Sequence, residues 1–367
     1  MKSQVFIQEF ITKYNQIEEL LIPFFDDEKF NDENFGNIVS LFEKLKIREN
    51  NNELKSVLRL ISAISRNHHR TPNFFGKIKR ILNYFKEEIH QNFSNFEIFN
   101  IFSKDKRILL TLFEEKILIP DKTIVLLSST REKHQQFDYP SYFSPEFQNG
   151  KEKVEADSQI FNEKREVGEN DDYLCQLIRD DSLEEFITYS SQTNIQLSTT
   201  VKKSIFETNS FLLENQPSLI EYSAFFGSIQ IMRYLQLNHV DLSPSLWLYA
   251  IHGRNPEMIH FLEENRVKPE DSTFKQCLIE SIKCHHNDLS KYIKDNLLQN
   301  QEESSSHDVV LQCLKYYNFI YLQDEINEVS KIFYDTNVFY EFCKYDYCSI
   351  VQFLLSVQDL NIKSIII

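Results

Sequence analysis

The residues with the clearest capacity for metal binding are cysteines and histidines in the third quarter of the chain. Cys284, His285 and His286 are consecutive, and Cys277 precedes Cys284 by seven positions. Zinc sites need two paired ligand elements, each with ligands about two to five residues apart, and no second element follows. We therefore expect no metal ligands and give these residues a structural or solvated role. His68 and His69 are expected at a helix end, where a cation suits the helix dipole.

A cysteine–histidine hydrolase is the other chemistry that these residue types permit. Nucleophile and base need to be adjacent only in space, so a distant pair such as Cys175 and His252 qualifies. Nothing in the sequence singles that pair out, and the G-x-S-x-G and H-E-x-x-H motifs of known hydrolases are absent. We expect no catalytic residue, no cofactor and no enzymatic activity.

Composition excludes further classes of function. The chain has 367 residues, with 40 Lys and Arg against 55 Asp and Glu, and a formal net charge of −15. Such a charge argues against nucleic-acid binding, which depends on clustered Lys and Arg. The 6 glycines are scattered, so a Gly-rich phosphate loop is absent.

The sequence also predicts where the protein is found. It has no apolar stretch of the roughly 18 residues that a membrane span needs, and no signal-peptide pattern at the start. We expect a cytoplasmic protein, with the nucleus as the alternative, whose 6 cysteines are reduced thiols in the core.

Helical periodicity dominates the sequence, with apolar residues three and four positions apart and almost no strand signal. This pattern predicts an all-α protein. We expect a helical N-terminal region at 1–130, a polar linker or mobile loop at 131–172, helical repeats at 173–298, a loop at 299–307 and further repeats at 308–367.

Self-similarity is the most informative feature of the second half. The stretch from Leu219 to Leu235 nearly matches Leu246 to Leu262, and related stretches follow at a period of about thirty. Each stretch predicts two short helices joined by a tight turn. We expect Gly227 and Gly253 to end first helices in the left-handed conformation, and Asn255 to cap a second helix. Helix pairs this short must stack on neighbours.

The stretch from Phe342 to Leu355 resembles the helix-turn-helix of an ankyrin repeat. The block from Ser218 to Asn296, and the chain as a whole, is similar to a divergent ankyrin-like family of unknown function that is expanded in parabasalid protists. The resemblance implies an ankyrin-like helical-repeat solenoid with a helical N-terminal region. The Thr-Pro-Leu-His stretch of standard ankyrin turns is nowhere intact, so the finger loops can be helical instead of hairpin-like.

The N-terminal region carries a further hint of repetition. An offset of 149 residues aligns the apolar residues of 98–118 with those of 247–267. We therefore interpret 94–122 as a degenerate repeat, which predicts a helix pair there that superposes on the later one.

This architecture predicts a non-enzymatic scaffold that holds a protein partner on its concave face and loops. Polar residues of two successive loops are the expected contacts: Asn238, His239, Asp241, Asn265, Arg266 and Lys268. The acidic total favours a partner with a basic face. The alternative is a regulatory or effector subunit of an enzyme, or a hydrolase with a dispersed site in the N-terminal region. The last repeat is expected to be uncapped, so that the apolar end at Ile365–Ile367 causes weak self-association.

Overall fold

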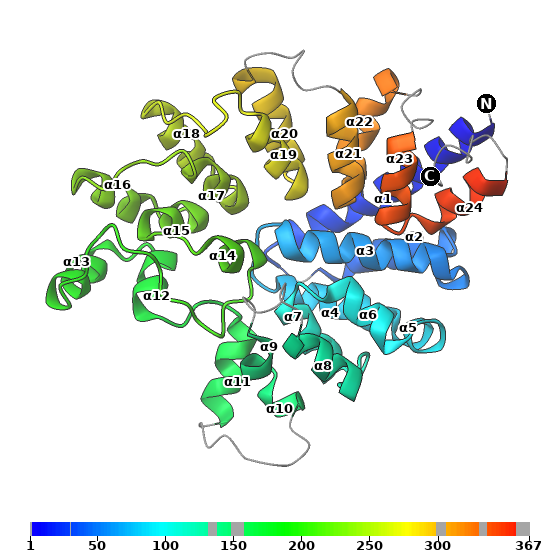
Figure 1. Ribbon diagram of the computed structural model, residues 1–367, viewed down its shortest axis with the longest axis horizontal. Helices are drawn as coiled ribbons and strands as arrows, with labels where there is room; N and C mark the ends of the chain where they lie inside the picture. The colour runs from blue at the N-terminus through cyan, green and yellow to red at the C-terminus, as the bar shows by residue number, and fades with distance from the viewer. Residues whose placement is uncertain are drawn as a thin grey trace. The chain divides into compact units, whose positions relative to one another are not determined.

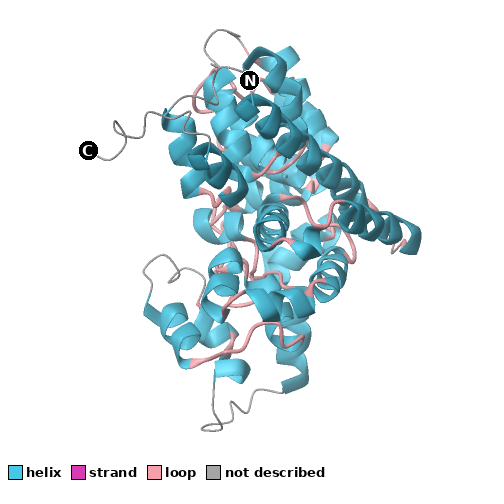
Figure 2. Cartoon of the chain, turned by 90° about the vertical axis from the view of Figure 1, so that its right-hand side faces the viewer, coloured by secondary structure: helices cyan, strands magenta, loops and turns pink. Residues whose placement is uncertain are grey.

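The computed structural model describes residues 2–29, 31–130, 138–147, 158–298, 306–329 and 336–356. Within these ranges the secondary structure is helical and contains no β-strand, which confirms the expected all-α class (Figure 2). One isolated antiparallel bridge joins Thr200 to Ser218. Helix labels follow Figure 1.

Contacts within the chain divide it into two compact units. The first unit combines the described residues of 1–64, 70–81 and 273–367, and the second combines 65–69 with 82–272. These boundaries differ from those expected at 130, 172 and 298, because the first unit joins the beginning of the sequence to its last quarter.

The first unit is built from α1 and α2, most of α3 and α4, and three later helix pairs. Its elements are α1 (Lys2–Asp26), α2 (Asp32–Lys44), η1 (Ile47–Glu49), α3 (Asn51–Asn67), α4 (Phe74–Tyr84), α19 (Lys275–Lys283), α20 (Asn287–Tyr292), η3 (Ile293–Leu297), α21 (Ser306–Tyr316), α22 (Phe319–Val329), α23 (Thr336–Lys344) and α24 (Cys348–Ser356). The last residues of α3 and α4 belong to the second unit.

Helix α1 packs directly on the later helix pairs of its unit. It contacts α22, α24 and α2, while the first helices α19, α21 and α23 contact one another in order (Figure 1). The apolar residues Ile7, Phe10 and Ile11 are buried, and the ring of Phe6 stacks on that of Phe353 at 3.9 Å. Helix α1 thus covers part of α24, and the expectation that the last repeat is uncapped stays a prediction. The end at Ile365–Ile367 lies outside the described residues.

The second unit contains an N-terminal group of helices followed by three helix pairs. Its elements are α5 (Lys86–Asn92), α6 (Asn95–Phe102), α7 (Lys106–Glu114), α8 (Lys122–Thr130), α9 (Tyr139–Tyr142), α10 (Ser144–Phe147), α11 (Ser158–Val167), α12 (Tyr173–Arg179), α13 (Leu183–Gln192), α14 (Ser210–Asn215), α15 (Leu219–Phe226), α16 (Ile229–Leu237), α17 (Leu246–Gly253) and α18 (Pro256–Glu264).

The first helices of these pairs stack side by side in the order α12, α15, α17. Helices α15 and α17 approach closely, and a Cβ atom added to Gly253 would lie 2.2 Å from the carbonyl oxygen of Phe225. Such a distance is far inside van der Waals contact, so only glycine fits at this position. Gly253 is required by close packing between helices.

A left-handed residue ends the first helix of every pair. The six residues with positive φ at these turns are Asp181, Gly227, Arg254, His285, Tyr317 and Asp346. Gly227, with φ of 70°, confirms its expected conformation, and the side chain of Asn255 caps α18 as expected. The prediction for Gly253 is wrong, because Gly253 is the last residue of α17 and Arg254 takes the left-handed conformation instead.

Residues 94–122 contain two helices, α6 and α7, whose second helix has caps that correspond to those of α18, while the interpretation as a degenerate repeat stays a prediction. Asp105 caps α7 through the amide of Ile108, as Asn255 caps α18 through that of Met258. After each second helix, Lys116 and Arg266 have the same φ of 55°. These matches give an offset of 150 for the second helices, one residue more than the sequence alignment suggests.

The expected linker at 131–172 is largely helical where the structure describes it. Asp138 caps α9, whose residues Tyr139 and Tyr142 are fully buried together with Phe143. Phe143 packs edge to face on Phe113 of α7, with ring centroids 5.3 Å apart. These aromatic residues precede the charged stretch 151–172. They give this part of the chain a buried apolar cluster that the expected linker would lack.

Candidate functional site

The six residues expected to meet a partner lie where the sequence placed them, in the loops after two successive second helices. Asn238 and Asn265 are the C-cap residues of α16 and α18, and both loops pass through a left-handed residue, His239 in one and Arg266 in the other. All six side chains are exposed.

The two loops are held in register by a direct contact. Gln236 donates a hydrogen bond from Nε2 to Oδ1 of Asn265 at 2.6 Å, and Asn265 in turn donates to the carbonyl oxygen of Phe261. Leu237, the residue after Gln236, has an exposed fraction of 77%. We call the surface formed by 237–241 and 265–268 the loop surface. It combines an exposed aliphatic side chain with ionisable groups of both signs, a composition suited to protein recognition.

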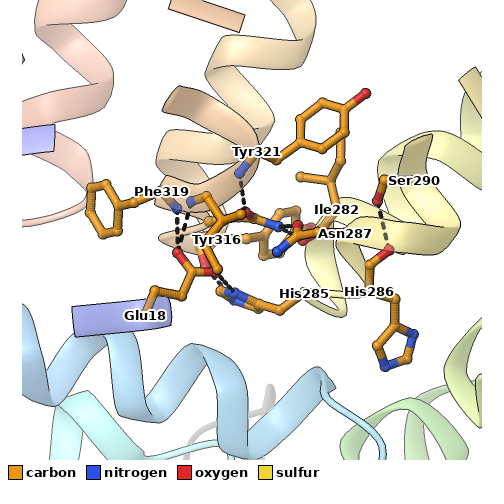
Figure 3. Close-up of polar contacts among 11 residues, drawn as sticks. Glu18, Ile282, His285, His286, Asn287, Ser290, Tyr316, Phe319 and Tyr321 are labelled. Carbon is orange, nitrogen blue, oxygen red and sulfur yellow. Dashed lines mark hydrogen bonds and ion pairs between the residues drawn. The ribbon is translucent and has the colours of Figure 1, made fainter. Parts of the chain in front are cut away.

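The cysteine and the two histidines at 284–286 are buried, and the contacts of His285 are structural. Cys284, His285 and His286 are all buried at the turn between α19 and α20, so the solvated alternative is wrong. Nδ1 of His285 lies 2.8 Å from Oε1 of Glu18 in α1, and its Nε2 lies 3.0 Å from the carbonyl oxygen of Tyr316 (Figure 3). Both ring nitrogens are engaged, which accounts for this histidine without a metal.

Each member of the Glu18 and His285 pair has a further hydrogen-bond partner. A carbonyl oxygen can only accept, so Nε2 of His285 carries a hydrogen. Oε2 of Glu18 accepts hydrogen bonds from the backbone amides of Phe319 and Ile320 at 2.6 and 3.1 Å, at the N-terminus of α22. Both oxygens of Glu18 are therefore engaged, one by His285 and the other by the start of α22.

The other residues considered for metal binding or catalysis are two histidines at a helix end, His252 and Cys175. His68 and His69 directly follow the last residue of α3, at the helix end where they were expected. The ring of His252 stacks on Phe211 with centroids 3.8 Å apart. Burial raises the pKa of Cys175 to about 12, the opposite of what a nucleophilic thiol requires.

A cavity of about 310 Å³ was not expected from the sequence. Between the turns at Asp181 and Gly227 the chain is 46 residues long, compared with 27 between Gly227 and Arg254. The longer interval contains the loop 193–209 and α14, which form one wall of the cavity. Its lining residues are Lys106, Asp138, Asn170, Val201, Lys202, Lys203, Ser204, Ile205, Glu207, Leu212, Leu213, Gln216, Pro217 and Tyr222. We call it the insertion cavity.

Lys106 is the most unusual residue of the insertion cavity, because it is a lysine with an exposed fraction of only 1%. Its Nζ donates to the carbonyl oxygens of Ile205 at 2.8 Å and Glu207 at 3.0 Å, and lies 4.8 Å from the ring centroid of Tyr142. Burial lowers the pKa of Lys106 to about 8, and the negative charges of Glu207 and Asp138 offset only part of this effect.

Hydrogen bonds connect several other residues that line the insertion cavity. Arg179 donates from Nη1 to the hydroxyl of Tyr222 and to the carbonyl oxygen of Asn170, while Nδ2 of Asn170 donates to the carbonyl oxygen of Lys202. Burial raises the pKa of Tyr222 well above its usual value, so it stays a neutral phenol. The cavity is therefore preorganised.

Two signals in the sequence could have indicated the insertion cavity and the buried pair of Glu18 and His285. The 46 positions from Asp181 to Gly227 are too many for a repeat of about thirty residues, which points to an insertion. Glu18 lies among Tyr14, Ile17 and Leu21 on the apolar side of α1, and a carboxylate in such a stripe calls for a buried partner.

The described helices include none that is both long and apolar enough to cross a lipid bilayer. Comparison of the chain with protein-family models, with curated proteins and with solved structures finds no match.

Proposed function

We propose that this chain is a non-enzymatic protein-interaction scaffold with an ankyrin-like arrangement of helix pairs. The observation that carries the proposal is the loop surface, two exposed loops from adjacent pairs fixed together by the Gln236 and Asn265 hydrogen bond. Loops on stacked helices lose little conformational entropy on binding, which favours affinity.

The proposed binding mode uses the loop surface together with the concave face that an ankyrin-like stack would present. Leu237 supplies apolar contact, and Arg266, Lys268 and Asp241 supply charges that select a partner. The net charge of −15 favours approach of a partner with a basic face. In the first unit, α1 already packs against α22 and α24, so the proposal concerns the second unit.

The experiment compares three versions of the chain as bait in a lysate of the source organism. The first is unaltered, the second has His239, Asp241, Arg266 and Lys268 changed to Ala, and the third has the exposed residues Glu87, Lys122 and Glu184 changed to Ala. A captured protein is then purified and titrated by calorimetry. We expect the loop variant to lose at least about tenfold in affinity, which is about 1.4 kcal/mol, and the third version to bind normally. Equal binding by all three would overturn the loop surface as the site.

The insertion cavity supports a second candidate function. A regulatory subunit needs a place where a small molecule can bind, and the cavity lies near the lower end of the roughly 300 to 1,000 Å³ typical of ligand sites. If this alternative holds, occupation of the cavity by a small molecule should change affinity for the captured partner. Unchanged affinity at saturation would remove it.

A further inference from the structure

We propose that Lys106 is a reactive amine that forms an imine with a small apolar aldehyde entering the insertion cavity. This inference is independent of the scaffold function, because the loop surface and the insertion cavity share no residue. It assigns the cavity a ligand class, and it assigns Lys106 the covalent bond.

The hydrogen bonds of Lys106 fit a neutral amine. A lysine ammonium carries three N–H groups, and a neutral amine carries two. Two carbonyl oxygens, those of Ile205 and Glu207, accept from Nζ. A neutral amine therefore satisfies both acceptors and keeps one lone pair for a carbonyl carbon. The ring of Tyr142 covers one side of Nζ, so an electrophile must approach from the cavity that Lys106 lines.

The environment of Lys106 also increases the neutral fraction of its amine. The partners of its Nζ are carbonyl oxygens instead of a carboxylate, and its side chain is buried. Desolvation disfavours the charged form, and the pKa of about 8 leaves roughly a quarter of the amine neutral at pH 7.5. A solvated lysine with an ordinary pKa near 10.4 is only about 0.1% neutral at that pH. Desolvation of this kind activates the lysine nucleophiles that form Schiff bases.

Part of the cavity wall is aliphatic, beside the polar and charged residues that complete the lining. Val201, Ile205, Leu212, Leu213 and Pro217 line it, and the volume of about 310 Å³ is much larger than one water needs. An aldehyde with a short hydrocarbon or aromatic tail matches this lining.

The reaction is balanced without any oxidant or reductant. The lone pair of Nζ attacks the carbonyl carbon and forms the C–N bond, while the carbonyl oxygen takes up a proton to give a carbinolamine. The hydroxyl then leaves with a proton as water, the C–O bond breaks and a C=N bond remains. Amine and aldehyde give imine and water, and hydrolysis reverses the reaction.

The test traps the imine in the complete folded chain. The protein is incubated at pH 7.5 with benzaldehyde and sodium cyanoborohydride, and peptide mass spectrometry measures the benzylation rate of each lysine. Lys202 is the internal reference, because it lines the same cavity with a side chain that is 82% exposed. We expect Lys106 to be modified at least about tenfold faster than Lys202, since its larger neutral fraction outweighs the lower nucleophilicity of a less basic amine.

Two controls separate reactivity from a purely structural role. The Lys106→Arg variant should lose the fast modification, and Lys122→Gln, at an exposed lysine that does not line the cavity, should retain it. In 6 M guanidinium the advantage of Lys106 over Lys202 should disappear, because the unfolded chain solvates both amines. Modification of Lys106 in the native unaltered protein at or below the rate of Lys202 would overturn the proposal, and this readout does not depend on the folding of any variant.

Discussion

Glu18 and His285 are fully buried and lie 2.8 Å apart, although 267 positions separate them in the sequence. The carboxylate of Glu18 also accepts two amides at the start of α22. Through this one side chain, α1 is joined both to the turn between α19 and α20 and to the helix pair that follows. The contact helps to hold the first unit together.

Loss of Glu18 should strongly destabilise the first unit. Glu18→Ala leaves the buried ring of His285 and two backbone amides of α22 without their acceptor, and a buried unsatisfied polar group typically costs about 1–3 kcal/mol. Glu19→Ala is the matched control, because Glu19 is the next residue on α1 and is exposed, so its loss should cost less than about 0.5 kcal/mol. Urea denaturation of both variants measures the difference. Equal midpoints would contradict the structural role of the pair, whereas partial recovery in Glu18→Leu with His285→Leu would support it.

Two glycine substitutions should change stability in opposite directions. Gly253→Ala places a Cβ against the carbonyl oxygen of Phe225, and the resulting overpacking should cost about 1–3 kcal/mol or more. At Gly76, inside α4, an added Cβ meets no atom within 4 Å, so Gly76→Ala should stabilise by about 0.5–1 kcal/mol. Thermal unfolding reports both effects. A tolerated Gly253→Ala would mean that α15 and α17 are farther apart than described.

The pKa of Lys106 predicts a particular dependence of stability on pH. Burial lowers this pKa from 10.5 to about 8, so the unfolded chain binds the proton more tightly than the folded chain. The resulting penalty on folding is fully present below pH 8 and is relieved as pH rises from about 8 towards 10.5, by at most about 1.4 kcal/mol per pH unit.

Urea unfolding at pH 7.5, 8.5 and 9.5 tests this dependence by comparing the unaltered chain with Lys106→Met. The stability of the unaltered chain relative to this variant should increase with pH. Tyrosines with raised pKa values are common to both proteins and cancel in the comparison. A Lys202→Met variant serves as the control and should follow the unaltered chain. A difference between Lys106→Met and the unaltered chain that stays constant with pH would show that Lys106 titrates normally.

The cysteines should differ sharply in alkylation. All six are free thiols, and the expectation that they are core residues is wrong for Cys343, which is exposed, while Cys348 is half-buried. Burial raises the pKa of Cys284 and Cys313 well above the usual value. Iodoacetamide at pH 8 should therefore modify Cys343 first and leave Cys284 and Cys313 intact until the protein unfolds. Comparable native rates at Cys313 and Cys343, measured by peptide mass spectrometry, would contradict the packing of α21.

Periodicity in the sequence was sufficient to predict the helices and their pairing, because burial of an apolar stripe is a local pattern. The conformation of individual turns was less predictable. Glycine can be selected for a positive φ or for the absence of a side chain, and Gly227 and Gly253 illustrate one reason each. The residue that bends the chain after α17 is Arg254, which no propensity scale would select.

The candidate sites were predictable only in part. The six loop residues are exposed as expected, because they follow helices whose ends the repeat pattern locates. The reactivity of Lys106 depends on burial by a loop about 100 positions later in the sequence, and desolvation of this kind leaves no local pattern. The partners of Glu18 are equally distant, and only its place in an apolar stripe hinted at them.

The packing of α1 on α22 and α24 has a consequence for synthesis on the ribosome. The apolar stripe of α1 leaves the exit tunnel about 300 residues before its partner helices, which at roughly 5–20 residues per second is a delay of about 15–60 s. During that time the segment 82–272, which is continuous, can complete its own contacts. The nascent chain must keep α1 from aggregating while it waits, so we expect general chaperones to associate with its first 26 residues.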